Sequence, residues 1–359
     1  MELLHVLSLL LLAAFMAFDS TQMEFCNGDQ VAHENFVSWD DLSVGNYSRN
    51  YDSNEEVGNR VIFVSLDGTG DSRTVQGAVD MVPDGNKERV KIFLSPGVYR
   101  EKVTVPITKP YISFISQGNS ETVISWNSRA SDRDSNRNIV GTFDSASVAV
   151  ESDYFCATGI TFENSAPVAE PGAVGKQAVA LRLSGDKAML YRCRVLGSQD
   201  TLFDHIGRHY FFQCYIQGAI DFIFGTARSL YQDCTLHAVA MSYGAVAASQ
   251  RNSPSDDSGF SFLNCRLTGS GKLYLGRAWG RYARVVYSYC QLENIIIPEG
   301  WSDWGDPSRT RTAWFGEFNC NGEGANMRNR VPWARSLTYE EARPFLNRDF
   351  IDGDQWLRL

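Results

Sequence analysis

The sequence predicts an all-β fold, a single-stranded right-handed parallel β-helix with short capping helices. The first observation is a repeat in which polar residues return at intervals of 21 or 22 residues, as from Gln177 to Gln199 and from Asp200 to Asp221. The second is a series of short β-type runs separated by turns, with no convincing long helix between residues 86 and 297. Stacked coils of about 20–25 residues are typical of a parallel β-helix. A β-sandwich would explain the strands but not the register.

A ladder of cysteines supports the same register. Five cysteines recur in one local context, Cys193, Cys214, Cys234, Cys265 and Cys290. One small thiol at the same place in each coil predicts a stack of buried thiols rather than scattered disulfides. Neighbouring coils lie about 4.8 Å apart, which is within disulfide reach, so one pairing stays open. It joins Cys234 to Cys265, where the interval lengthens to 31 residues.

The expected elements follow one another from residue 60. Regular structure should begin at residues 60–64, an apolar run of β type. A short helix should then cap the stack, because apolar residues recur at helical spacing. They are Val75, Ala78, Val79 and Val82. Further strands are expected around each ladder cysteine and at residues 90–94, 111–115, 123–126, 148–150 and 159–162.

The C-terminal part is expected to leave the repeat after Trp301. Residues 303–330 are rich in Gly, Asn and Arg, so we expect a loop there. A short helix is expected at residues 337–342, with Thr338 as its N-cap and Glu341 at the capping-box position.

The N-terminal segment indicates export. The run from Leu3 to Phe18 is almost wholly apolar but too short to span a membrane comfortably, so residues 1–19 are interpreted as a secretory signal peptide. Residues 20–58 are polar and without periodicity, as in an extension or linker, and residues 59–359 form the β-helix domain. The sequence therefore predicts a secreted, extracellular protein with no membrane partner. Asn46 begins a glycosylation sequon, for which a glycan and an unused tripeptide are equally open interpretations.

Length and charge narrow the function further. The 359 residues are ample for a sizeable core. The formal net charge of −9 argues against a nucleic-acid partner, which requires a basic surface.

The repeat brings polar side chains to one face of the stack, and two of them are carboxylates. Asp200 and Asp221 should project from adjacent coils, roughly 5–7 Å apart. Because two carboxylates that close cannot both ionise freely, their pKa values should separate. Arg277 is the cation that would keep Asp221 ionised and leave Asp200 protonated. Such a pair combines a nucleophile with a general acid, while the amides of Gln177 and Gln199 suit a developing oxyanion.

Each of these residues also has a structural interpretation. A single Asp or Gln in a β-helix is commonly a turn residue or part of a polar ladder. Trp279 and Trp301 could be core aromatics, or they could stack against sugar rings. No G-x-S-x-G or H-E-x-x-H motif occurs, so neither a serine-hydrolase nor a zinc-protease site is indicated.

Several motifs in order resemble the plant pectin methylesterase (pectinesterase) family. They are Gly97–Glu101, Gln177–Arg182, Gln199–Leu202, Gly218–Gly225 and Leu275–Trp279, followed by a matching tail over residues 300–320. The resemblance extends from about residue 60 to residue 359. It implies a parallel β-helix that demethylesterifies cell-wall pectin (homogalacturonan) and releases methanol. The roughly 40 residues before the domain are too few for the inhibitor-like pro-domain of many plant relatives.

The resemblance also implies a role for each catalytic residue. Asp221 would attack the ester carbonyl and form an acyl-enzyme. Asp200 would protonate the departing methanol and then activate water. Gln177 and Gln199 would stabilise the tetrahedral anion, and Arg277 would orient Asp221.

Substrate contacts and partners are implied in the same way. Gln177, Arg277, Trp279 and Trp301 would bind the sugar chain. Neither a metal nor an organic cofactor is implied. Pectin is the implied partner, an inhibitor protein is a further candidate, and a monomer is expected.

Two other functions remain open from the residues alone. Carboxylates about 5 Å apart also suit a retaining glycosidase, and a lyase could use the same scaffold. The glutamine pair favours the ester, because acyl transfer needs an oxyanion site. A catalytically inactive β-helix that binds pectin is the third interpretation, and the complete set of candidate side chains weighs against it.

Overall fold

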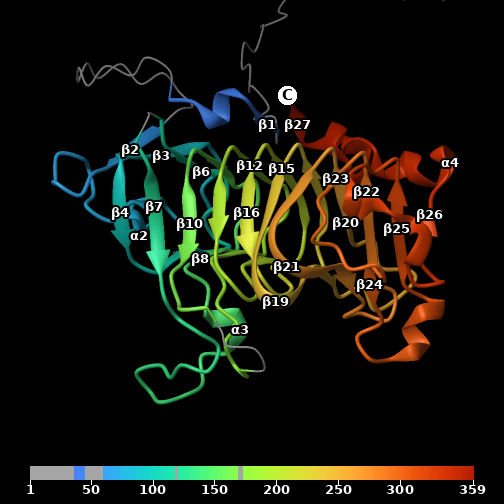
Figure 1. The fold of residues 1–359 in the computed structure, drawn as a ribbon. Coiled ribbons are helices and arrows are strands. Elements are labelled where there is room, and N and C mark those ends of the chain that lie inside the picture. The colour runs from blue at the N-terminus through green and yellow to red at the C-terminus, as the bar shows by residue number, and fades with distance from the viewer. Residues whose placement is uncertain (1–35, 45–59, 118–119, 169–172) are drawn as a thin grey trace, which may run out of the picture. The chain divides into compact units, whose positions relative to one another are not determined.

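The computed structural model describes residues 36–44, 60–117, 120–168 and 173–359. These residues wind into a parallel β-helix, seen from the side in Figure 1. Every ladder between its named strands is parallel, and the predicted right-handed parallel β-helix is confirmed. The predicted signal peptide and the Asn46 sequon lie outside the described residues.

The strands form three rows, and the coils in the middle of the stack contribute one strand to each row. The first row contains β2 (Arg60–Val64), β3 (Val90–Leu94), β6 (Ile112–Ile115), β9 (Cys156–Thr158), β12 (Ala188–Tyr191), β15 (Arg208–Phe212), β18 (Arg228–Gln232), β20 (Gly259–Leu263), β22 (Arg284–Ser288), β25 (Trp314–Phe318) and β26 (Arg335–Ser336). The second contains β4 (Gly97–Arg100), β7 (Thr122–Trp126), β10 (Thr161–Asn164), β13 (Arg194–Leu196), β16 (Tyr215–Gly218) and β23 (Gln291–Leu292).

The third row includes the strands that follow Gln177, Asp200 and Asp221 in the chain. It contains β5 (Val103–Val105), β8 (Val148–Val150), β11 (Leu181–Leu183), β14 (Leu202–Asp204), β17 (Ile223–Gly225) and β24 (Trp301–Ser302). The long strands β19 (Thr235–Ser249) and β21 (Arg266–Arg277) belong to the second row in their first halves and to the third in their second halves.

The cysteine ladder marks the corner between the first and second rows. The residue before each ladder cysteine has a left-handed backbone with φ between 48° and 55°: Arg192, Gln213, Asp233, Asn264, Tyr289 and Asn319. The cysteine carbonyl then accepts a hydrogen bond from the next coil, as from Tyr215 N to Cys193 O at 2.9 Å. The predicted ladder is confirmed, and Cys320 extends it by one coil.

The Cys234–Cys265 disulfide, the pairing that the sequence left open, is not formed. Both residues are buried, free thiols. Cys234 Sγ lies 3.5 Å from the carbonyl oxygen of Phe211, and Cys265 Sγ lies 3.3 Å from that of Tyr231. Each thiol therefore donates to a main-chain carbonyl of the preceding coil, and the corner is closed by hydrogen bonds.

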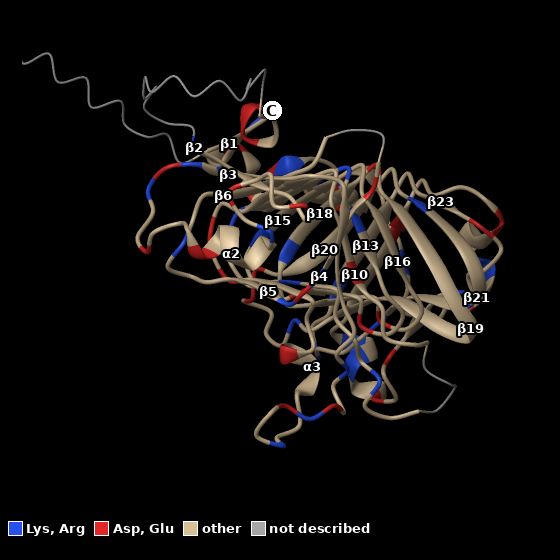
Figure 2. Ribbon diagram, turned by 90° about the vertical axis from the view of Figure 1, so that its left-hand side faces the viewer, with Lys and Arg blue, Asp and Glu red and all other residues tan. Residues whose placement is uncertain are grey.

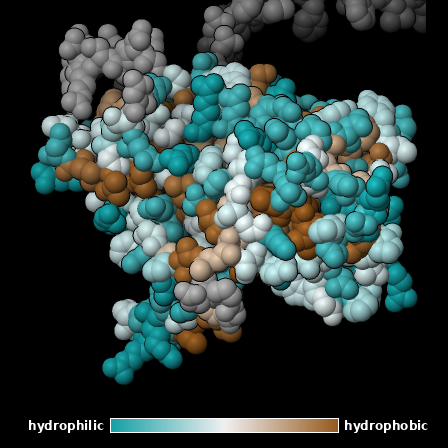
Figure 3. Space-filling view, in the orientation of Figure 1, coloured by the Kyte–Doolittle hydropathy of each residue, from teal (hydrophilic) through white to brown (hydrophobic). Residues whose placement is uncertain are grey.

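Stacked side chains fill the interior of the coil. Phe211 and Tyr231 stack with ring centroids 4.5 Å apart, and Phe262 and Tyr287 do the same. Aliphatic residues of all three rows surround them, so a continuous core follows the helix axis. Residues of both charge signs are spread along the ribbon in Figure 2. On the face shown in Figure 3, hydrophobic residues gather in patches among hydrophilic ones.

Short helices cover the ends and edges. Helix α2 (Val75–Asp80) is the predicted N-terminal cap, with the Thr74 hydroxyl accepting from Gly77 N. Helix α4 (Tyr339–Ala342) has the predicted capping box of Thr338 and Glu341. The other short elements are α3 (Gly141–Asp144), η1 (Asp40–Leu42), η2 (Pro307–Arg311), η3 (Glu323–Ala325), η4 (Met327–Asn329), η5 (Arg343–Phe345), η6 (Arg348–Ile351) and η7 (Gly353–Gln355).

The loop predicted for residues 303–330 is partly wrong, because β25 continues the first row there. Strand β25 pairs with β22. Its Glu317 is buried and forms an ion pair with Arg330, with Nε 2.8 Å from Oε1. The sequence did not predict this strand because the charged Glu317 interrupts its run of apolar residues.

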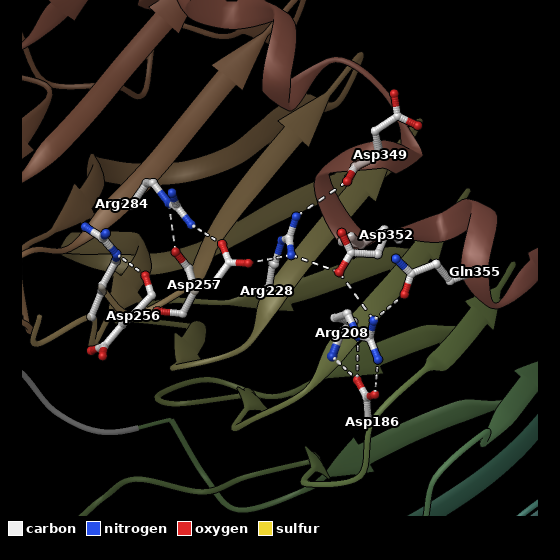
Figure 4. Close-up of polar contacts among 12 residues, drawn as sticks. Asp186, Arg208, Arg228, Asp256, Asp257, Arg284, Asp349, Asp352 and Gln355 are labelled. Atoms are coloured by element: carbon white, nitrogen blue, oxygen red, sulfur yellow. Dashed lines mark hydrogen bonds and ion pairs between the residues drawn. The ribbon is translucent and has the colours of Figure 1, made fainter. Parts of the chain in front are cut away.

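The segment around η6 and η7 is fastened across the first row by ion pairs, drawn in Figure 4. Asp352 accepts from Arg228 at 3.0 Å and from Arg208 at 3.3 Å. Asp257 pairs with Arg228 at 2.6 Å and with Arg284 at 3.3 Å.

Residues 36–44, predicted to belong to an extension or linker, also join the domain. Strand β1 (Val37–Ser38) pairs with the C-terminal strand β27 (Leu357–Arg358).

Candidate active site

The candidate site lies along the third row, at the points where successive coils enter it. Asp200 and Asp221 lie shortly before β14 and β17 and have left-handed backbones with φ of 58° and 46°. Aspartate tolerates this conformation better than most residues. The two coils are held in register by the hydrogen bond from Asp200 N to Ile220 O, 3.0 Å long. Both carboxyl groups therefore line one cavity, of about 430 Å³.

Arg277, at the end of β21, holds Asp221. Its Nε lies 2.8 Å from Oδ1, and its Nη2 contacts Oδ2 to complete a two-point ion pair. Asp221 is 5% exposed. Burial raises the pKa of Asp221, and the hydrogen bonds and charge of Arg277 oppose that rise. The guanidinium thus favours the ionised carboxylate and fixes its orientation.

Asp200 has the stronger preference for the proton. Its pKa is raised well above the ordinary value, first by burial and second by the charge of Asp221. Arg277 and Gln199 oppose the rise without cancelling it. Of the two carboxyl groups, Asp200 is therefore the one that keeps a proton as the pH rises.

The two glutamines line the same cavity. Gln199 forms a parallel bridge with Ile220 on the next coil. Gln177 is held through its main chain, whose carbonyl accepts from Ala130 N at 2.8 Å. Among the described residues, the Gln177 Oε1 atom is one of the buried side-chain atoms without a hydrogen-bond partner. The structure thus brings together six of the sequence-predicted residues: Gln177, Gln199, Asp200, Asp221, Arg277 and Trp279.

Aromatic rings form a continuous line across the cavity, and sequence inspection found only Trp279 of them. The centroids of adjacent rings in this line lie 4.4–6.4 Å apart. The line runs through Phe143, Phe203, Phe224, Trp279 and Trp304. A signal was available for two of them, because Phe203 and Phe224 each follow a cavity aspartate by three residues.

Trp301 does not line the cavity, which corrects the expectation that it binds sugar. It is 1% exposed, its ring stacks on Phe315 at 4.6 Å, and its indole Nε1 donates to Glu317 at 3.2 Å. A Cβ on Gly276 would lie 3.0 Å from this ring, so the missing side chain gives the indole its place beneath β21. Trp304, three residues later, lines the cavity instead and lies over Arg277 at 4.0 Å.

Transfer of an acyl group from an ester requires a nucleophile, an acid for the leaving alcohol and donors for the oxyanion. This fold and site geometry define a class of β-helical carboxylic-ester hydrolases. The family model described as Pectinesterase matches residues 61–354, and the chain belongs to this family.

Individual relatives agree with the family. The chain is 56% identical to pectinesterase QRT1 of Arabidopsis thaliana over 346 residues, which are 91% of each protein. It is 45% identical over 306 residues to probable pectinesterase 8 of the same plant, covering 83% of this chain and 76% of that protein. The structure of pectin methylesterase from carrot superposes with a TM-score of 0.76 at 35% identity, covering 84% of this chain and 96% of the carrot chain. The predicted family and enzyme class are thereby confirmed.

Proposed function

We propose that this protein is secreted and demethylesterifies cell-wall pectin through an acyl-enzyme on Asp221. The observation that carries the proposal is the two-point pair of Arg277 with Asp221 in the cavity that also contains Asp200, whose pKa is raised. One carboxylate is oriented as an anion, and the other retains a proton. The names of the relatives, which are pectinesterases and pectin methylesterases, supply the substrate class.

In the first step, an oxygen of Asp221 attacks the carbonyl carbon of a galacturonate methyl ester. A new C–O bond forms, and the negative charge on the former carbonyl oxygen is stabilised by the amides of Gln177 and Gln199. The bond to the methoxy group then breaks while Asp200 gives its proton to the leaving oxygen. Methanol leaves, and the galacturonyl group remains attached to Asp221 as an anhydride.

In the second step, the roles of Asp200 reverse. Its carboxylate now takes a proton from water, whose oxygen attacks the acyl carbon. The anhydride bond to Asp221 breaks, which releases a free galacturonate carboxyl group. Asp221 returns to its ion pair with Arg277, and Asp200 is protonated again, so that each turnover consumes one water.

The line of aromatic rings suits a polysaccharide. Rings such as Trp279 and Trp304 present apolar faces with which the faces of sugar rings can stack. The line crosses neighbouring coils and so runs along the axis of the β-helix. We expect the sugar chain to follow it, with the reacting ester above Asp221.

Export is supported by the apolar segment before residue 20. In the described part of the chain, no helix is long and apolar enough to cross a membrane. Expression of the complete chain in plant cells, followed by N-terminal sequencing of the protein recovered from the wall fraction, tests this. Retention of the intact N-terminus inside the cell would contradict it.

The central experiment is methanol release from highly methylated pectin by the wild type and an Asp221→Asn variant. We expect release by the wild type and a loss of about 1,000-fold or more in the variant, as for removal of other nucleophiles. Asp349→Asn is a matched control, because Asp349 lies in η6 and is absent from the lining of the cavity. Unchanged release by Asp221→Asn would remove that residue from its role. New reducing ends without methanol would favour a glycoside hydrolase, and unsaturated ends without methanol would favour a lyase.

Two partner proposals accompany this function. We expect the enzyme to act as a monomer, which sedimentation of the purified protein at micromolar concentration checks. We also expect an inhibitor protein that covers the cavity to compete with pectin, which would raise the apparent KM without changing kcat.

A further inference from the structure

One end of the aromatic line is made by a short element that does not belong to the coil itself. Phe143 lies in α3, which projects from the coil before β8, and it is 42% exposed. In Figure 1, α3 and the loop before it extend beneath the row of strands, opposite the segment that follows β24. Both Thr142 and Phe143 line the cavity. A four-residue helix cannot hold an aromatic ring in place by itself, so its support must come from the coil.

The support for the Phe143 ring is Arg182 of β11. The guanidinium carbon of Arg182 lies 3.6 Å from the centroid of the Phe143 ring, a stacked cation–π contact. The Arg182 side chain is only 4% exposed. It is fixed at its edges, because Nη1 donates to Ser184 Oγ at 2.8 Å and Nη2 pairs with Glu151 Oε1 at 3.0 Å.

Burying the charged Arg182 side chain costs free energy of folding. A contribution to stability therefore does not by itself explain why this side chain is buried. Among the described residues, its Nε is buried without a hydrogen-bond partner, and Glu151, the carboxylate with which it pairs there, is 36% exposed. A buried ion pair can often be replaced by apolar side chains with no loss of stability. A planar cation, however, combines a flat face for an aromatic ring with edges whose N–H groups donate hydrogen bonds in fixed directions. That combination suits the placement of a ring.

A second residue, His205, contacts the Phe143 ring from the side. His205 meets the Phe143 ring edge-on, at 5.5 Å between centroids, and its Nδ1 lies 3.0 Å from the same Ser184 Oγ that Arg182 contacts. His205 also packs on Phe203, the next ring of the line, at 4.8 Å. Arg182 is therefore linked through Ser184 and His205 to two neighbouring rings of the cavity.

The backbone of α3 is held by different residues. Lys102 Nζ donates to the carbonyl of Asp144 at 2.6 Å, and the buried Asn164 donates to the carbonyl of Ser145 at 3.3 Å. These contacts locate the helix, whereas Arg182 contacts the ring. The two tasks can thus be separated by mutation.

We propose that Arg182 is a positioning residue that fixes the Phe143 ring as the sugar-stacking wall at the N-terminal end of the cavity. The ring would bind a galacturonate unit that lies beyond the one whose ester reacts. This inference rests on the proposed function, since it assigns part of the pectin-binding surface. It predicts that Arg182 acts on binding of long chains and leaves the chemical step at Asp221 unchanged.

The test compares Arg182→Met, Phe143→Ala and the double variant, with Arg194→Met as the matched control. Arg194 is also an arginine that pairs with a glutamate and lies over an aromatic ring, but it is on the second row and 47% exposed. KM and kcat for methanol release are measured on long methylated pectin and on methylated digalacturonate. Affinity for methylated oligogalacturonates is measured by calorimetry in the inactive Asp221→Asn background.

For Arg182→Met we expect KM on long pectin to rise about 10-fold with kcat unchanged, which corresponds to about 1.4 kcal/mol. The calorimetric affinity should fall by a similar factor, and methylated digalacturonate should be hydrolysed as by the wild type. Phe143→Ala should behave alike, and the double variant should be no worse than Phe143→Ala alone, because the two residues act as a unit. Arg194→Met should match the wild type.

Additive effects of the two changes, or an equal fall of kcat on both substrates, would overturn the inference. If Arg182→Met does not fold, Arg182→Lys and Glu151→Gln provide the same test. Lysine keeps the positive charge but lacks the planar guanidinium, and Glu151→Gln removes the charged partner that anchors the guanidinium. Failure of the proposed function is distinguishable, because it appears as absence of methanol from the wild type. Calorimetry on the oligogalacturonates still decides whether Arg182 acts through Phe143 in that case.

Discussion

His209, in β15, and Asp204, in β14, form a completely buried pair. His209 Nδ1 lies 2.5 Å from Asp204 Oδ1, and both side chains are 0% exposed. His209 Nε2 lies 2.8 Å from the carbonyl oxygen of Gly185, and Tyr231 donates to the other Asp204 oxygen at 2.6 Å. With Asp204 ionised, both ring nitrogens face acceptors, and this arrangement favours the imidazolium form of His209. Asp204 directly follows Phe203, so the pair braces the strand that carries this cavity ring.

This pair predicts a pH-dependent stability. Burial lowers the pKa of His209, but the charge and hydrogen bond of Asp204 outweigh burial, and the net shift is upward. A folded-state pKa above the unfolded value contributes stability that is complete below about pH 6.5 and is lost as the pH rises through the folded value. Thermal unfolding of wild type and His209→Gln between pH 5 and 9 checks this. The difference in Tm should shrink as the pH rises, and a constant difference would contradict the imidazolium.

Asp200 should control the alkaline side of the activity profile. Burial and the charge of Asp221 raise its pKa, so it remains protonated to a higher pH than an ordinary aspartate. Since the first step needs that proton, kcat should fall as the pH rises through the raised pKa of Asp200. Asp200→Asn should lower kcat by about 100- to 10,000-fold, the usual contribution of a general acid. Its remaining activity should lack the alkaline fall, and persistence of that fall would assign it to another group.

Arg277 should be irreplaceable by lysine. Lysine keeps the charge but cannot form the two-point contact that Nε and Nη2 make with Asp221. We expect Arg277→Lys to lower kcat for pectin by about 100-fold, because a displaced nucleophile loses its attack geometry. The acid limb of the kcat profile, which reports protonation of Asp221, should stay closer to wild type in Arg277→Lys than in Arg277→Met. Equal profiles for the two variants would show that charge makes no contribution.

Trp301 and Trp304 should separate stability from binding. Trp301 is buried against Phe315, so Trp301→Ala should destabilise the protein by about 3–5 kcal/mol in denaturant unfolding. Trp304 is 36% exposed beside Arg277, so Trp304→Ala should raise KM for pectin and change stability by about 0.5 kcal/mol or less. A rise in KM for Trp301→Ala together with a large loss of stability for Trp304→Ala would contradict the placement of Trp301 in the core and of Trp304 in the cavity.

The ladder thiols should be free but unreactive in the folded protein. Burial raises the pKa of Cys193 to about 12, and Cys234 and Cys265 are shifted upward for the same first reason. Alkylation without reductant should therefore label the peptides containing Cys234 and Cys265 only after unfolding in guanidinium. A peptide pair linked through these two residues would show that they bridge after export.

The sequence alone determined the register of the coils, and with it most of the site. A side-chain ladder must repeat once per coil, so the returns from Asp200 to Asp221 and from Cys193 to Cys214 identify positions that stack. Strands β2 and β3 were found at their observed bounds because their apolar runs are local. Gln177, Gln199 and Arg277 could be assigned to the same cavity since motif and register agree.

Only the tertiary structure decided which neighbouring residues face inward. Trp301 rather than Trp304 is buried because Gly276, on the adjacent strand, leaves room for one indole beneath β21. Phe143 joins the cavity through α3, and Arg182 turns its guanidinium to that ring from another coil. Strand β1 finds its partner β27 at the opposite end of the chain. Such contacts depend on complementary shape between segments distant in sequence, whereas a periodic pattern carries information only about each segment's own turn and register.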